Sequence, residues 1–268
     1  MDAHRDACHP VRVKRARPRA WLDATVARVV AALGAVAALA VVAAFSADAP
    51  AATQARGAHE TQLSHGSVTR WAYVLEPTAA RAAPTSAAPL VTVVSPTTAD
   101  GLPNLVVALA SRPDAYGRPW VRVRLAILPN NSTGWVRRES LGDLHLVRTR
   151  LVVDRARLLI ALWRNGHLLF RARIGVGQRR WPTPRGEFYV REKLSGFGDP
   201  FYGPIAFGTS GRSAVLTDWP GGGYIGIHGT DEPDLLPGRV SHGCIRLRNA
   251  DIRRLAALLP LGTPLSVR

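Results

Sequence analysis

The sequence predicts a mainly β protein with two β-rich units and one short helix. Three observations predict this fold class. Short apolar runs separated by Gly, Pro, Asn and Asp recur from about residue 68 onward, an Asn-Gly pair stands between two of these runs, and helical periodicity is confined to the carboxyl-terminal end. A chain of 268 residues, 47% of them apolar, is long enough to bury the cores of two folded units.

The amino-terminal 66 residues have a different character. An uncharged run of Ala, Val and Leu from Val29 to Phe45 follows an Arg-rich start. Basic residues before such a run predict a transmembrane anchor or signal segment at 29–46, forming an apolar helix, with residues 1–28 as a basic cytoplasmic tail. The small residues at 46–49 would allow cleavage, whereas the long polar lead favours an anchor. The low-complexity residues 47–66 are expected to be a flexible spacer, which places the rest of the chain in the cell envelope, membrane-anchored or secreted.

The chain is strongly basic, with a formal net charge of +16 and a pI of about 11.4. This charge suits an acidic polymer, an anionic lipid surface or a nucleic acid. No groove-reading motif accompanies it, so we expect no nucleic-acid partner. Acidic cell-wall polymers are the partners that fit an exported basic protein, and residues 29–46 would contact the membrane if they are not cleaved.

Residues 67–146 are expected to form a small SH3-like β domain. The run WVRVRLAIL alternates Val121, Val123 and Leu125 with Arg122 and Arg124, as in a strand with one buried face. A turn is expected at 130–134, and the Ala- and Pro-rich stretch 79–89 is expected to be a loop. The other predicted strands are TRWAYVL, LVTVVS, NLVVALA and GWVRRESL.

Residues 147–268 form the second predicted unit. Asn165-Gly166 separates two strand-like runs and predicts a two-residue hairpin, because both residues tolerate the positive φ of a type I′ turn. A helix is predicted where Ile252, Leu255, Ala256 and Leu259 recur at helical spacing, with Asn249 as its amino-terminal cap and Pro260 as its stop. The predicted strands are LVVD, LLIALWR, HLLFRARIGVG, GEFYVREKL, PIAFGTS and GYIGIHG.

Cys244 is the cysteine expected in the exported part, since Cys8 lies in the segment that stays in the cytoplasm or is removed. It has three interpretations. It is a small buried hydrophobe; or it joins His228, Asp231 and His242 in a zinc site, although no HExxH or paired CxxC spacing supports one; or it is a nucleophile activated by a neighbouring histidine.

Four ordered motifs resemble the L,D-transpeptidase family. His228-Gly229 followed by Ser241-His242-Gly243-Cys244 is similar to the family's catalytic signature. The stretch from Thr183 to Phe188, the segment GPIAFGTSG and the run VVDRARLLIALWRNGHLLFRARIGVG also resemble the family, so the likeness covers about residue 151 to the end. It implies an L,D-transpeptidase catalytic domain at 147–268 with a β-sandwich fold.

The resemblance also implies roles for the site residues. Cys244 would attack, His228 would be its base, and the Gly229 carbonyl would orient the imidazole as a carboxylate does in other triads. No metal and no cofactor would be needed, because thiolate, imidazole and backbone amides supply the chemistry.

The other signature residues are expected to bind substrate or stabilise the oxyanion. His242 would shape the pocket, while Ser241 and Gly243 complete the turn before the nucleophile. Arg246 would hold a substrate carboxylate with its guanidinium; its alternative is an ordinary surface arginine.

The implied reaction is a transpeptidation on peptidoglycan stem peptides. A donor stem would be cut after its third residue, releasing D-alanine and leaving a thioester on Cys244, and an amine of a second stem would then form a cross-link between third residues. Such a reaction serves cell-wall biogenesis and cell shape. Water in place of the amine would make the protein a carboxypeptidase. A hydrolytic cysteine peptidase is the nearest enzymatic alternative, and a wall-binding or structural protein that keeps the fold is the alternative from another class.

Overall fold

The computed structural model describes residues 59–195, 199–217 and 223–268. The predictions for residues 1–28 and 29–46 lie outside this part of the chain. Within it, no helix is long and apolar enough to cross a membrane. The mainly β prediction is confirmed: the described residues form two large sheets and one α-helix, α1 (Asn249–Ala256).

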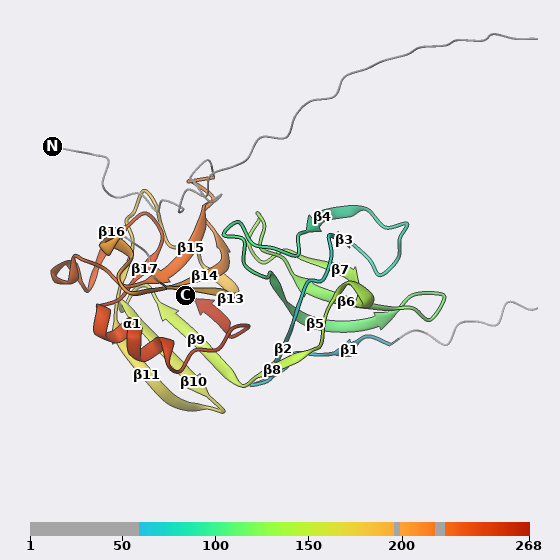
Figure 1. Cartoon of the computed structure of the whole chain (residues 1–268), viewed down its shortest axis with the longest axis horizontal. Helices are drawn as coiled ribbons and strands as arrows, with labels where there is room; N and C mark the ends of the chain where they lie inside the picture. The colour runs from blue at the N-terminus through green and yellow to red at the C-terminus, as the bar shows by residue number, and fades with distance from the viewer. Residues whose placement is uncertain (1–58, 196–198, 218–222) are drawn as a thin grey trace, which may run out of the picture. The chain divides into compact units, whose positions relative to one another are not determined.

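The first sheet has eight strands in the order β4-β3-β7-β6-β5-β2-β8, with β1 paired to β5 (Figure 1). The predicted alternation in β6 is confirmed, because Val121 and Val123 are fully buried and Leu125 follows them into the same core. The strands are β1 (Thr61–Gln62), β2 (Thr69–Tyr73), β3 (Thr78–Arg81), β4 (Leu90–Val94), β5 (Leu105–Pro113), β6 (Pro119–Arg124), β7 (Thr133–Arg137) and β8 (His145–Val147), with a 3-10 helix, η1 (Arg138–Ser140), after β7.

Two expectations for this unit need correction. Part of the expected spacer belongs to the sheet: Thr61 and Gln62 pair with β5, and the backbone N–H of Leu63 donates to the Leu109 carbonyl at 2.9 Å. The expected loop at 79–89 begins with β3, whose alanines offered no strand signal. The physical reason is the same in both cases, because tertiary pairing with a neighbouring strand outweighs weak local propensity.

The second sheet has ten strands in the order β11-β10-β9-β18-β13-β14-β15-β17-β12-β16. Its strands are β9 (Thr149–Asp154), β10 (Leu159–Arg164), β11 (His167–Arg173), β12 (Gly175–Gly177), β13 (Gly186–Ser195), β14 (Ile205–Arg212), β15 (Tyr224–His228), β16 (Gly238–Ser241), β17 (Ile245–Arg246) and β18 (Pro264–Val267). Two further 3-10 helices, η2 (Pro200–Tyr202) and η3 (Pro233–Leu235), lie in its connections. Figure 1 shows the chain's last strand entering this sheet beside β9.

The predicted hairpin is present between β10 and β11. Asn165 and Gly166 both have positive φ, 50° and 82°, and Arg164 pairs directly with His167. This is the two-residue connection with positive φ at both positions that the sequence predicts.

The helix α1 buries the predicted face but is capped differently. Ile252 and Leu255 are fully buried in the core beneath the second sheet. Asn249 is the first helical residue rather than the cap; Arg248 occupies the cap position without a side-chain cap bond. Asn249 instead accepts a hydrogen bond from the backbone N–H of Thr230 at 2.9 Å, so its amide serves a neighbouring loop. The helix also ends at Ala256, before Pro260.

The turn at 130–131 contacts the second sheet. Asn130 forms two hydrogen bonds with the backbone of Arg212, at 2.7 and 3.0 Å, and the Asn131 side chain accepts from the N–H of Glu187 at 2.7 Å. Burial raises the pKa of Tyr189, so its hydroxyl stays protonated and donates to the Leu105 carbonyl at 3.2 Å. These bonds fix β13 and β14 against the first sheet, and β14 pairs with β15.

Candidate active site

Cys244 lies where the turn after β16 enters β17. The parallel pairing of β15 with β17 aligns Ile227 with Ile245 and His228 with Arg246, so the end of β15 runs beside the residues that follow the cysteine. The thiol is 5% exposed, and the N–H of Gly226 lies 3.4 Å from its Sγ. The sheet register therefore brings two segments that are distant in the sequence to one point.

His228 ends β15 as a buried side chain, 1% exposed. Its Nδ1 lies 2.7 Å from the carbonyl oxygen of Gly229. Because a carbonyl can only accept a hydrogen bond, Nδ1 carries the proton, and the neutral ring has its lone pair on Nε2. Nε2 is buried and has no hydrogen-bond partner among the described residues. The ring is thus held in the tautomer that a general base requires.

The position of Gly226 relates the thiol to the imidazole. A Cβ placed on Gly226 would lie 3.8 Å from Cys244 Sγ and 3.8 Å from His228 Cδ2. Both atoms border the same small space, so their separation is at most twice that distance. The structure brings together the two residues that the sequence singled out as nucleophile and base.

Two aromatic rings that the sequence analysis did not identify cover the histidine. The Phe201 and Tyr202 rings of η2 lie 5.9 and 5.2 Å from the His228 ring, centroid to centroid. Close backbone contacts hold η2 there: a Cβ on Gly203 would lie 2.7 Å from Gly229 Cα. The adjacent Phe-Tyr pair after Gly-Asp-Pro was the available signal. The rings restrict access to the imidazole from that side.

The turn 241–243 is held by Ser241 and Thr183. The Ser241 hydroxyl donates to the Cys244 carbonyl at 2.5 Å and accepts from the N–H of Gly243 at 3.1 Å. Thr183, fully buried, accepts from the N–H of Gly177 at 2.9 Å and donates to the Gly243 carbonyl at 2.7 Å. The threonine of the TPRGEF stretch therefore positions the turn before Cys244, a role the sequence analysis did not assign to it.

Gly243 has a φ of +121°, a conformation that L side chains rarely adopt. The N–H of Gly243 donates to the Ser241 hydroxyl. To stabilise an oxyanion, as expected, this N–H must give up that hydrogen bond and donate to the substrate instead. That part stays a prediction.

His242 packs its ring on Trp181, with centroids 3.8 Å apart. It lines a small surface hollow together with Cys244. The other lining residues are Ser213, Leu216, Gly223, Tyr224 and Ile225. His242 thus faces the space in front of the nucleophile, where a substrate would meet the sulfur.

Arg246 is buried, 2% exposed, which excludes the surface alternative. Its Nη1 lies 3.0 Å from Glu232 Oε2, and its guanidinium carbon lies 4.5 Å from the centre of the Phe201 ring. These contacts tie β17 to the loop after His228 and to η2. The substrate-clamping role expected for this side chain stays a prediction.

The zinc interpretation grouped Asp231 with both histidines and the cysteine. In the described part of the chain, no three His, Cys, Asp or Glu side chains come together as a group that could hold a metal ion. Asp231 is exposed. The residues present form a cysteine–histidine site.

A buried thiol beside a tautomer-fixed imidazole is the arrangement found in the class of proteins that use a cysteine nucleophile. Comparison with known proteins adds the family. The YkuD family model, the L,D-transpeptidase catalytic domain, matches residues 148–267. A Bacillus subtilis relative named as an L,D-transpeptidase of the YkuD type is 30% identical over 128 residues, covering 48% of this chain and 71% of the relative. The chain belongs to the L,D-transpeptidase family.

Two further proteins show the extent of the likeness. A Bacillus licheniformis relative with a name of the same type is 32% identical over 118 residues, which are 44% of this chain and 64% of the relative. The crystal structure of an Enterococcus faecium L,D-transpeptidase mutant is 26% identical, covers 45% of this chain and 49% of that chain, and has a TM-score of 0.36. The chain thus spans less than two thirds of these two proteins.

Proposed function

We propose that this protein is an L,D-transpeptidase that acts on peptidoglycan stem peptides through a thioester on Cys244. One observation carries the proposal: His228 donates from Nδ1 to the Gly229 carbonyl and leaves Nε2 to accept a proton, next to the buried thiol. Family membership and the basic character of the chain support it.

The first half of the proposed reaction starts at the thiol. The Cys244 proton passes to His228 Nε2, and the thiolate attacks the carbonyl carbon of the third stem residue. The imidazolium then gives its proton to the leaving D-alanine nitrogen, and the C–N bond breaks to leave an acyl-thioester. The Gly229 carbonyl holds the ring in place through both transfers.

The second half reverses the proton path. An amine of another stem gives a proton to His228 and attacks the thioester, so that an amide forms and the thiol is restored. Attack by water would give a carboxylate instead. The proposed role is cross-linking in cell-wall biogenesis, with the site outside the cytoplasmic membrane and residues 29–46 as anchor or signal. The β-sandwich and SH3-like assignments of the two sheets belong to the same proposal.

Acylation by a carbapenem tests the nucleophile. The full chain, with its thiol confirmed reduced, is incubated with the drug and its intact mass is measured. We expect a gain of one drug molecule, no gain in Cys244→Ala, and strongly slowed acylation in His228→Gln. His167→Gln, a change at an exposed histidine of the β10–β11 hairpin, is the matched control and should acylate at the wild-type rate.

An unchanged mass of the reduced wild-type protein would contradict the proposal. The product then distinguishes the two fates of the thioester. A soluble tetrapeptide stem is supplied with and without an acceptor amine, and the products are separated by mass. A cross-linked product that requires Cys244 supports transpeptidation, whereas tripeptide alone, with acceptor present, contradicts it in favour of the carboxypeptidase.

A further inference from the structure

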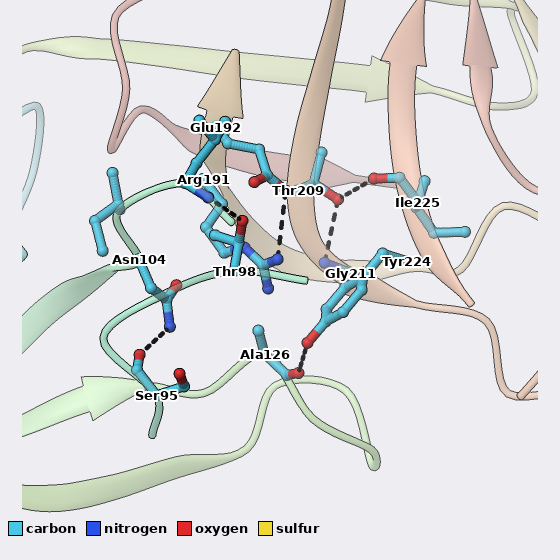
Figure 2. A network of polar contacts seen from close by, with 12 residues as sticks. Ser95, Thr98, Asn104, Ala126, Arg191, Glu192, Thr209, Gly211, Tyr224 and Ile225 are labelled. Carbon is cyan, nitrogen blue, oxygen red and sulfur yellow. Dashed lines mark hydrogen bonds and ion pairs between the residues drawn. The ribbon is translucent and has the colours of Figure 1, made fainter. Parts of the chain in front are cut away.

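A cavity of about 180 Å³ lies apart from Cys244, between strand β4 with the loop that follows it and strands β13 and β15. Tyr224 lines both this cavity and the hollow in front of Cys244. Figure 2 shows the polar side chains on its walls, with the Tyr224 hydroxyl donating to the Ala126 carbonyl at 3.1 Å. The cavity is therefore walled by both sheets.

A β-bulge directs Arg191 to the cavity. The pairing of β13 with β14 passes from Val190 directly to Glu192, which leaves Arg191 as the extra residue. Bulges of this kind redirect a side chain, often near functional sites. Arg191 is 4% exposed, lines the cavity and lies with its guanidinium carbon 4.3 Å from the centre of the Tyr224 ring.

The guanidinium keeps donor capacity after its protein contacts. The Nη2 group of Arg191 donates to Glu192 Oε1 at 3.3 Å, as drawn in Figure 2. The Nε–H of Arg191 is buried and has no hydrogen-bond partner in the described part of the chain. A guanidinium has five N–H donors in a fork that matches a carboxylate. Such a group, nine-tenths buried on a cavity wall, indicates a ligand with negatively charged oxygen atoms.

Asn104 places an unused hydrogen-bond acceptor on the cavity wall. Its Nδ2 donates to the Ser95 carbonyl at 2.8 Å, and this bond fixes which way the amide points. Its Oδ1 is buried without a partner among the described residues, and Asn104 lines the same cavity. The walls thus offer one unused donor group and one unused acceptor. A ligand that fits both carries a carboxylate and an N–H close together, as the terminal residue of a peptide does.

Size and surroundings agree with that ligand. Ligand pockets for drug-sized molecules measure roughly 300–1,000 Å³, so 180 Å³ suits one terminal residue. β4 is an edge strand of the first sheet, and Thr92, Val93 and Val94 of this strand line the cavity. Leu90 and Val93 are 55% and 58% exposed. An extended peptide can pair with such an edge while its carboxyl group reaches the guanidinium.

We propose that this cavity binds the carboxyl-terminal residue of a peptide, with Arg191 holding the carboxylate and Asn104 accepting from the terminal amide N–H. The site lies beside the one that carries Cys244, and its ligand need not react. A stem-peptide end and a protein carboxyl terminus share this chemistry, and the chirality of the terminal residue distinguishes them.

The test uses the full chain carrying Cys244→Ala, titrated with N-acetyl-D-alanine and N-acetyl-L-alanine and with the methyl ester of each. NMR follows the backbone of residues 92–104 and the Arg191 Nε–H. We expect saturable shifts at both places with an acid and none with its ester. A D preference assigns the site to stem peptides and an L preference to protein carboxyl termini; either result supports a carboxyl-terminal site.

Two variants locate the binding. Arg191→Gln should weaken it about tenfold or more, because a charge-assisted hydrogen bond is lost. Since that buried change can unfold the protein, Ala99→Trp at an exposed lining residue is the second variant: it should block the cavity and abolish the shifts, while Ala99→Ser retains them. No shift with either acid, equal shifts with the esters, or unchanged binding in Ala99→Trp would overturn the proposal. Carbapenem acylation of Cys244 in the wild-type chain is independent of this outcome.

Discussion

Thr183→Val should destabilise the protein and slow acylation together. The exchange keeps the size of the side chain and removes its hydroxyl, which joins the N–H of Gly177 to the carbonyl of Gly243. Thr183 is 1% exposed, so water does not replace the lost bonds. A buried polar group left unsatisfied costs about 1–3 kcal/mol. Two such groups predict a loss of roughly 2–6 kcal/mol in the free energy of unfolding.

Urea unfolding at constant m-value measures that loss, and Thr183→Ser is the matched control. Serine keeps both hydrogen bonds and gives up one methyl group, which costs about 1 kcal/mol. Because Gly243 immediately precedes Cys244, the carbapenem acylation rate should fall in the valine variant and stay near wild type in the serine variant. Equal stability of the two variants would refute the reasoning, since the hydroxyl would then contribute nothing.

Three further predictions concern other parts of the fold. In Gly229→Ala, the added Cβ would lie 2.3 Å from Asn249 Oδ1 and 3.0 Å from Gly203 Cα, so the carbonyl that holds His228 must move. The acylation rate of this variant should fall by about a hundredfold, and a wild-type rate would contradict the prediction. Gly142→Ala is the control and should keep the wild-type rate, because its added Cβ meets only ordinary van der Waals contacts. Gly166→Ala, at φ +82° in open space, should lower the free energy of unfolding by about 1 kcal/mol in urea titration without changing acylation. Desolvation raises the pKa of Asp114, but hydrogen bonds from the N–H groups of Arg118 and Tyr116 outweigh it and lower the pKa to about 2, from an ordinary 3.8. The ionised Asp114 therefore stabilises the fold above pH 3.8, and this stabilisation is lost as pH falls toward 2. The melting temperature of Asp114→Asn should lie below that of the wild type at pH 7 and converge with it at low pH.

Local signals predicted the elements whose pattern is decided within a few residues. The φ preferences of Asn165 and Gly166 are enough to determine the turn between β10 and β11. A strand with one buried face is enough to explain the alternation around Val121. Both elements are found as predicted. β18 was not identified, because Pro264–Val267 is short and begins with proline. It is a strand because it inserts between β9 and β13, a partnership that local sequence does not encode.

The candidate site shows the same division. The motif predicted that His228 and Cys244 belong together, and the β15–β17 register brings them together. The motifs assigned no role to Thr183 and did not include Phe201, because the contacts of these residues with the site arise from the packing of loops far apart in the sequence. Asn249 was misassigned for a related reason: asparagine before a helical pattern is a common cap, but here the amide is used by the Thr230 N–H of another loop.

At Arg246, packing favours a different role from the one expected from the sequence. In the sequence it is a cation two residues after Cys244, and the resemblance to the family implies a substrate clamp there. In the structure its guanidinium pairs with Glu232 and lies over the Phe201 ring. The same Phe201 ring also contacts the His228 ring. A buried cation is stable only with such partners. Glu232 lies in the loop that follows His228, so this one side chain joins β17 to that loop and to the ring packed on the imidazole. Its geometry therefore favours a positioning role for Arg246, in which removing the cation would loosen the base before it affected any contact with substrate.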